Sequence, residues 1–174
     1  MKRTQFLPIC MIIFGFVSGN LFSQNPTVIK IDPDRTIATV DPNIYGAFVE
    51  PIRTVVYGNI YDPGSSFADE NGFRKDVIQL LRELKIPVVR WPGGNYVSGY
   101  NWEDGIGPKD QRPARLDLAW HQVETNQMGT DEYVKLCKLI GSENFICINA
   151  GTGTLDQARH WVEYCNIEKG TWYS

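Results

Sequence analysis

The chain has 174 residues, of which 43% are hydrophobic and 21% are charged, and its net charge is −3. This length and composition are typical of one soluble globular domain with its own core. Because phosphate binding needs clustered Lys and Arg, the acidic balance argues against a nucleic-acid partner. Aromatic residues make up 12% and include five Trp, which fits either core packing or stacking on the apolar faces of sugar rings.

The first 23 residues have the pattern of an export signal. Lys2 and Arg3 give a positive start, residues 6–17 form an uncharged apolar run, and Ser18 and Ser23 are small residues near a possible cleavage point. The pattern predicts a secretory signal peptide over residues 1–23 and a periplasmic or extracellular protein, with an uncleaved anchor as the alternative. The run is short for a membrane span, so no stable membrane anchor is expected.

Short β-branched runs follow the predicted signal peptide. Residues 27–31 and 36–40 alternate and are separated by Asp and Pro, which predicts a hairpin or two edge strands within residues 24–42. The apolar run at residues 44–49 predicts a further strand. Residues 51–70 are rich in Gly, Pro, Ser and Asp, so they predict a loop.

From residue 73 onward, helical and strand patterns alternate. Apolar stripes predict helices at residues 73–84, 130–140 and 154–165, and apolar runs predict strands at residues 86–91 and 145–148. Candidate helix caps are Asp69 or Asn71, Thr130, Thr154 with Gln157, and Gly141. The alternation predicts right-handed βαβ units and a parallel sheet. An open doubly wound sheet and a (β/α)₈ barrel both fit, although a whole barrel takes about 250 residues.

The cysteines and histidines indicate neither a disulfide framework nor a metal site. Cys137, Cys147 and Cys165 are an odd number outside the signal peptide, and each lies in an apolar stretch, which predicts small buried side chains. Together with His121 and His160 they lack zinc-site spacing. No metal and no cofactor are therefore expected.

Polar side chains follow the predicted parallel strands, where such folds bind ligands. Glu50, Arg90, Asn95 and Asn149 place a carboxylate, a guanidinium and two carboxamides on one rim, a set that suits a neutral polyol. A structural ion pair between Glu50 and Arg90 is an equally weighted alternative. The glycine loop at residues 151–153 lacks the third glycine of a dinucleotide loop, so that match is weak.

A longer stretch is far more specific. The sequence RWPGGNYVSGYNWEDGIGPKDQRPARLDLAWHQVETNQMGTDEY at residues 90–133 closely resembles α-L-arabinofuranosidases of glycoside hydrolase family 51. Residues 44–51, 58–63, 68–78 and 158–166 carry the same resemblance. It implies an α/β fold in which residues 43–174 form about three β/α units of a TIM (β/α)₈ barrel. It also implies that residues 24–42 supply short strands of a β-sandwich.

The resemblance implies a retaining glycoside hydrolase that releases terminal L-arabinofuranose from arabinan and arabinoxylan. Retention needs two carboxyl groups about 5 Å apart, and in the family both are Glu residues that would lie beyond Ser174. The first is expected in a Gly-Asn-Glu about 20 to 30 residues further on, in the next β/α unit. Residues 1–174 alone are then expected to be inactive. A non-catalytic carbohydrate-binding remnant and a chain that does not fold stably are the alternatives, and full-length relatives often form homo-oligomers.

The resemblance also implies roles for individual side chains. Glu50 is similar to the family's substrate-binding Glu, Asn95 to the Asn that hydrogen-bonds arabinose, and Arg90 to the Arg that steadies the catalytic carboxylates. Trp120 resembles an aromatic wall beside the leaving-group sugar, and Asn149 is a weaker candidate for lining the pocket.

Three residues beside Glu50 depart from the family pattern. Ala47 and Pro51 stand where relatives usually have His, and Arg53 replaces a usual Gly. These departures leave the family assignment in place but question the fine specificity of the rim.

Overall fold

The computed structural model describes residues 27–168, so the predicted signal peptide lies outside the described part. Two compact units divide the chain, one ending at Thr39 and the other beginning at Val40. Among residues 27–168 no helix is both long enough and apolar enough to cross a membrane.

The described part of the first unit, residues 27–39, contains a turn but no strand. Arg35 N–H donates to Asp32 O at 3.4 Å, and Ile29 and Ile37 are 81% and 88% exposed. The strands predicted at residues 27–31 and 36–40 are therefore not formed. A strand requires a hydrogen-bonded neighbour, and neither segment has one among the described residues.

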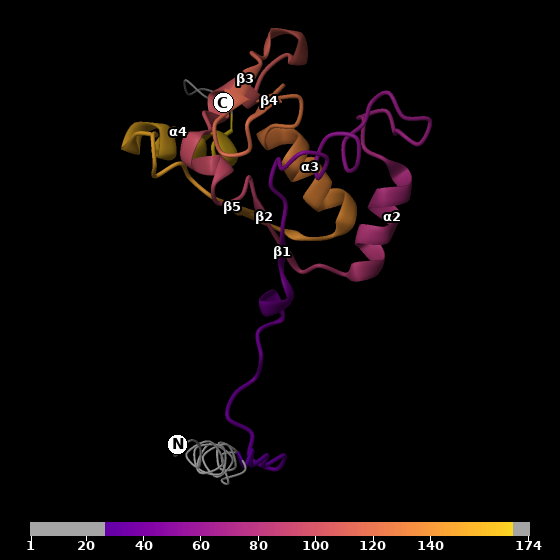
Figure 1. The fold of residues 1–174 in the computed structure, drawn as a ribbon, viewed down its shortest axis with the longest axis vertical. Helices are drawn as coiled ribbons and strands as arrows, with labels where there is room; N and C mark the ends of the chain where they lie inside the picture. The colour runs from indigo at the N-terminus through magenta and orange to yellow at the C-terminus, as the bar shows by residue number, and fades with distance from the viewer. Residues whose placement is uncertain (1–26, 169–174) are drawn as a thin grey trace, which may run out of the picture. The chain divides into compact units, whose positions relative to one another are not determined.

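The second unit is built on a parallel sheet, as predicted. Its strands are β1 (Ala47–Phe48), β2 (Val88–Trp91) and β5 (Glu143–Ile146), in the order β1-β2-β5. Helices α2 (Lys75–Leu84) and α3 (Thr130–Ile140) connect these strands, and α4 (Leu155–Asn166) follows β5. Figure 1 shows α2 and α3 beside one another on one side of the strands.

Several element boundaries differ from the predicted ones. A short 3-10 helix, η1 (Pro42–Tyr45), occupies the beginning of the first predicted strand, because the Asp41 side chain accepts from Asn43 N–H and starts a turn. Strand β5 begins two residues earlier than expected and ends at Ile146. A side-chain hydrogen bond sets the boundary at η1, and pairing with β2 sets the boundary of β5. An apolar run in the sequence indicates neither contact.

The helix caps were predicted correctly in part. Thr154 and Gln157 form the expected capping box, and Gly141 ends α3 with a φ of 77°. Thr130 is the first residue of α3, and its hydroxyl accepts from the Trp161 indole at 3.0 Å instead of capping the helix. Asp69 accepts from the N–H groups of residues 71 and 73, so it caps the turn before α2 rather than α2 itself.

The long segment between β2 and α3 shows no clear helical or strand period in its sequence, but it is structured. It contains a two-stranded antiparallel hairpin, β3 (Arg115–Asp117) with β4 (Gln122–Glu124). Three short 3-10 helices precede the hairpin: η2 (Tyr96–Gly99), η3 (Trp102–Gly105) and η4 (Lys109–Gln111). Strands of three residues are too short to show a reliable alternation in sequence.

An aromatic core joins the helices to the sheet. Trp91 stacks on Tyr133 of α3 with ring centroids 5.0 Å apart, and it meets Trp161 of α4 edge-on at 6.0 Å. The Tyr133 hydroxyl donates to Val89 O at 2.5 Å and accepts from Phe145 N–H at 2.7 Å, so it links β2 to β5. These contacts assign at least part of the aromatic content to core packing.

Helix α4 is less buried than predicted. Of its residues only Trp161 is buried, whereas Val162 is 60% exposed and Cys165 is exposed. The expectation that Cys165 is a buried side chain is thus wrong, while Cys137 is buried as expected. The outer side of α4 has no further element packed on it among the described residues.

The face of the sheet that points away from α2 and α3 is uncovered among residues 27–168. Arg90 lies in register with Phe48 on one side and Phe145 on the other, so the three side chains share a face. Phe48 and Phe145 are 59% and 53% exposed. A parallel sheet normally carries cover on both faces, and this face has none among residues 27–168.

Candidate functional site

Three of the predicted site residues lie just after the carboxyl ends of neighbouring strands. Glu50 follows β1, the loop carrying Asn95 follows β2, and Asn149 follows β5. Backbone hydrogen bonds continue the sheet to this edge: Val49 N–H donates to Arg90 O, and Cys147 N–H donates to the carbonyl of residue 91, each at 2.8 Å.

The Glu50 carboxylate is buried beneath the loop that follows β2, with 5% of the residue exposed. Its Oε1 accepts from Tyr96 N–H at 2.9 Å and from the Trp120 indole Nε1 at 3.0 Å. Its Oε2 accepts from Gly94 N–H at 3.2 Å. A carboxylate offers about four lone-pair positions. Three bonds therefore fix the group and leave Oε2 able to accept from a ligand hydroxyl.

Gly93 allows the backbone to pass directly against Glu50. Its φ is +117°, and a Cβ placed there would lie 2.3 Å from Glu50 Cγ and Cδ. Only glycine fits this combination of conformation and contact. Gly94 has more room, because a Cβ there would meet Arg90 Nη2 at 3.9 Å. That distance also shows that the guanidinium end lies near the loop that binds Glu50.

We expect Gly93→Ala to lower the free energy of unfolding by about 1–3 kcal/mol, the usual cost of forcing an extra methyl group into packed space. Gly94→Ala is the matched control and should change stability by less than about 0.5 kcal/mol, as at other open positions. Urea unfolding followed by Trp fluorescence measures both variants. Equal stability of the two would contradict the close approach of Gly93 to Glu50.

Arg90 is held by an aromatic ring and not by an acid. Its guanidinium carbon lies 5.4 Å from the centroid of the Phe48 ring. Its Nε is buried and has no hydrogen-bond partner among residues 27–168, and no ion pair joins it to Glu50 there. The predicted alternative of a structural Glu50–Arg90 pair is therefore wrong. An unpaired buried N–H is costly, so Arg90 is suited to an acceptor beyond the described residues.

Trp120 reaches Glu50 from the tip of the β3–β4 hairpin. Asp117 shapes this tip, because its two carboxylate oxygens accept from Ala119 N–H at 3.0 Å and from Trp120 N–H at 2.8 Å. The indole is partly buried and packs against the main core. The hairpin thus brings Trp120 to a residue 70 positions earlier in the chain.

Gln122 fastens the same hairpin to the segment that follows Glu50. Its Nε2 donates to Pro51 O at 2.6 Å, and its Oε1 accepts from Arg53 N–H at 2.7 Å. Together with the Trp120–Glu50 bond, these two bonds join the hairpin to the segment after β1 at three points. Sequence reasoning did not identify Gln122, since nothing in its local pattern marks it.

The side chains of Asn95 and Asn149 differ in how many hydrogen bonds they already form within residues 27–168. Asn95 is exposed, forms no side-chain hydrogen bond within residues 27–168, and lines a pocket of about 360 Å³ with Tyr96 and Asp117. Asn149 is already occupied: its Oδ1 accepts from the N–H groups of residues 151 and 152, and its Nδ2 donates to Tyr100 O and to the Thr152 hydroxyl, all at 3.0 Å. In this structure Asn149 shapes its own loop.

Glu124 is a buried acid that sequence reasoning missed. It is 3% exposed, and its Oε1 accepts from the Tyr57 hydroxyl and from Asn126 N–H at 2.7 Å. Burial raises the pKa of Glu124, and these hydrogen bonds only partly offset the effect. The contact joins β4 to the loop before α2, so it supports the hairpin from behind.

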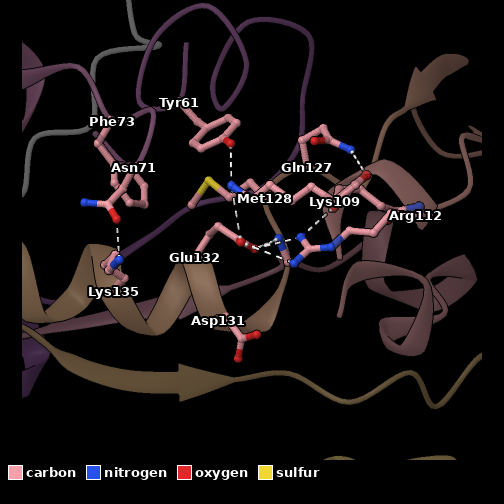
Figure 2. A network of polar contacts seen from close by, with 12 residues as sticks. Tyr61, Asn71, Phe73, Lys109, Arg112, Gln127, Met128, Asp131, Glu132 and Lys135 are labelled. Atoms are coloured by element: carbon pink, nitrogen blue, oxygen red, sulfur yellow. Dashed lines mark hydrogen bonds and ion pairs between the residues drawn. The ribbon is translucent and has the colours of Figure 1, made fainter. Parts of the chain in front are cut away.

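A second buried acid anchors the segment before the hairpin to α3. Glu132 accepts from Arg112 Nη1 at 2.9 Å and from Gly129 N–H at 2.8 Å, and Lys109 Nζ lies 3.4 Å away. Arg112 also donates to Asn126 O at 2.9 Å, and its side chain is 3% exposed. Figure 2 shows Lys109 and Arg112 converging on Glu132 above α3. These contacts, which we call the Arg112–Glu132 clamp, join the segment before the hairpin to the beginning of α3. They therefore hold both ends of the loop that carries Trp120.

We expect Glu132 to contribute to stability in a pH-dependent way. Burial raises its pKa, but hydrogen bonds from Arg112 and from Gly129 N–H outweigh burial and hold the pKa below its usual range. Because the folded-state pKa is the lower one, the contribution is complete above the unfolded value of about 4.3. It is lost as the pH falls through the folded-state pKa. Urea midpoints of wild type and Glu132→Gln should therefore differ at pH 7 and converge in acid; a constant difference would contradict this.

Within residues 27–168 no group of three or more His, Cys, Asp or Glu side chains is arranged to hold a metal ion. The strand ends offer hydrogen-bond donors and acceptors, one guanidinium and one indole ring. These groups are able to bind and orient a hydroxyl-rich ligand.

Comparisons with known proteins agree with this geometry. The family model described as "Alpha-L-arabinofuranosidase 1 domain" matches residues 80–172. α-L-Arabinofuranosidase C of Emericella nidulans is 54% identical over 154 residues, which is 88% of this chain and 31% of the relative. The chain thus spans about 31% of the length of this curated relative.

Solved structures give the same result. The GH51 α-L-arabinofuranosidase of Thermotoga petrophila is 55% identical, with a TM-score of 0.77 over 82% of this chain and 30% of its own. The α-L-arabinofuranosidase of Thermotoga maritima, solved as an arabinose complex, is 59% identical, with a TM-score of 0.72 over 74% of this chain and 27% of its own. The sheet, the strand-end side chains and the family match lead to one conclusion: the chain belongs to glycoside hydrolase family 51, the α-L-arabinofuranosidases.

Proposed function

We propose that this chain is the part of a retaining α-L-arabinofuranosidase that binds the terminal L-arabinofuranose, and that the two catalytic carboxyl groups lie past Ser174. The observation that carries the proposal is the Glu50 carboxylate, fixed by Gly94, Tyr96 and Trp120 with one acceptor position open. The arabinose complex of the Thermotoga maritima relative supports a furanose ligand. The expected substrates are arabinan- and arabinoxylan-type side chains.

Each site residue has a physical task in this proposal. Glu50 Oε2 and the Asn95 carboxamide hydrogen-bond the sugar hydroxyls, and Trp120 forms a wall beside the leaving-group sugar. Arg90 offers its buried Nε, which has no partner among residues 27–168, to a catalytic carboxylate and keeps that group ionised. Asn149 contributes indirectly, by fixing the loop after β5.

The uncovered face of the sheet supports the barrel architecture. In a (β/α)₈ barrel the inner faces of the strands are covered by the remaining strands. The exposed Phe48 and Phe145 rings flank Arg90 on such a face. We propose that further strands close the barrel over these rings. In the same proposal residues 24–42 pair with a β-sandwich, and residues 1–23 direct export to the periplasm or the extracellular space.

The test is to continue the reading frame past Ser174 and to express the complete protein. A Gly-Asn-Glu should occur in the next β/α unit, and the product should hydrolyse para-nitrophenyl α-L-arabinofuranoside with retention, measured by NMR of the released sugar. Residues 1–174 alone should show no hydrolysis, because both the acid/base and the covalent step need the missing carboxyl groups. A complete protein without that activity would refute the proposal.

A further inference from the structure

Two exposed basic side chains flank the candidate site on unusual backbone. Arg53, three residues after Glu50, has a φ of 49°, and His121, directly after Trp120, has a φ of 53°. Positive φ is unfavourable for residues with a Cβ and is normally filled by Gly or Asn. Such outliers persist where the surrounding structure enforces them, and they gather at functional sites.

The two residues belong to segments that are bonded to each other. Arg53 N–H donates to Gln122 Oε1 at 2.7 Å, and Gln122 is the neighbour of His121. One residue before His121, the Trp120 indole donates to Glu50 at 3.0 Å. The segments that carry Arg53 and His121 are therefore joined next to the Trp120–Glu50 contact.

Neither basic side chain is used by the described part of the fold. Within residues 27–168 the Arg53 guanidinium and the His121 imidazole form no ion pair and no hydrogen bond. The acids at this rim are engaged elsewhere: Asp117 accepts from the hairpin tip, and Glu50 accepts from three N–H donors. Among residues 27–168, the joined segments thus carry a guanidinium and an imidazole that are both available to a ligand.

We propose that Arg53, together with His121, forms a subsite for a carboxylate carried by the substrate beyond the arabinofuranosyl ring, as in a uronic acid residue. The inference rests on the proposed function, because Trp120 then separates the arabinose from the leaving group. The planar guanidinium fork matches a carboxylate in two parallel hydrogen bonds. A uronic acid is the form in which a polysaccharide presents that group.

The test uses the complete protein and two uncleavable, thio-linked ligands in isothermal titration calorimetry. One ligand joins arabinofuranose to a uronic acid, and the other carries the corresponding alcohol. Wild type should bind the acid roughly two- to fivefold tighter than the alcohol, as expected for an exposed charge pair. The preference should fade at about 1 M salt, where the screening length falls to about 3 Å.

Arg53→Gly should abolish the preference for the acid, and Arg53→Lys should retain only part of it, because the fork is lost while the charge stays. Arg159→Gln removes one exposed positive charge from α4 and is the control for net charge; it should keep the wild-type preference. Equal binding of acid and alcohol by wild type, or a preference that survives in Arg53→Gly, would overturn the subsite.

Hydrolysis of para-nitrophenyl α-L-arabinofuranoside separates the two proposals. This substrate has no carboxylate, so its cleavage by wild type tests the arabinofuranosidase proposal without involving the acid subsite. If wild type fails to cleave it, the arabinofuranosidase proposal fails, while the calorimetric comparison of acid and alcohol still decides the subsite.

Discussion

Arg112→Ala is expected to lower the free energy of unfolding by about 3–5 kcal/mol, because it leaves the buried Glu132 charge without its main partner. Arg112 is 3% exposed and donates both to Glu132 and to Asn126 O, so its loss also leaves a buried carbonyl unsatisfied. The measurement is urea unfolding of the purified protein at pH 7, followed by circular dichroism.

Arg115→Ala is the matched control for that experiment. Arg115 also donates to an acid, Asp104, at 2.9 Å, but its side chain is 62% exposed. An exposed ion pair contributes about 0–1 kcal/mol, so this variant should remain close to wild type. Similar losses in the two variants would show that the Arg112–Glu132 clamp has no special role in holding the loop before α3.

Glu50→Gln is expected to reduce kcat/KM of the complete enzyme by about 100-fold or more, the order found when a binding group is misplaced by about 1 Å. The replacement amide has the same size, but its NH₂ group must face Gly94 N–H or the Tyr96 and Trp120 donors. Two donors then oppose each other, so the side chain turns away and Trp120 loses its anchor. Initial rates with para-nitrophenyl α-L-arabinofuranoside measure the effect.

Glu143→Gln is the control for the loss of a carboxylate from the same sheet. Glu143 is exposed at the beginning of β5, the end of the strand away from the site. Its replacement should leave kcat/KM within about twofold of wild type, as at other surface positions. If Glu50→Gln were as active as Glu143→Gln, the Glu50 carboxylate would have no part in substrate binding.

The regular part of the fold was predictable because its signals are local. The apolar stripe of α3, the Thr154–Gln157 capping box and Gly141 all act within a few residues, and the structure confirms them. Strand β2 was predicted two residues too long at its start, since Pro87 cannot donate to the sheet. The alternation of strands and helices also correctly predicted a parallel sheet.

The sequence indicated several of the residues that lie at the strand ends, but not the contacts between them. Glu50 and Trp120 were both identified, yet the bond between them spans 70 residues and depends on a hairpin that the sequence did not reveal. Gln122 was missed for the same reason, because its partners Pro51 and Arg53 are 71 and 69 residues away. Asn149 was identified, but its local hydrogen bonds became evident only from the loop geometry.

A crystal structure of the complete protein with L-arabinose tests most directly whether the strand ends form the sugar pocket. We expect a sugar hydroxyl within about 3 Å of Glu50 Oε2, a second hydrogen bond from Asn95, and an unbroken Trp120–Glu50 bond. Arabinose bound elsewhere, with Glu50 and Asn95 making no contact to it, would contradict the assignment of this pocket.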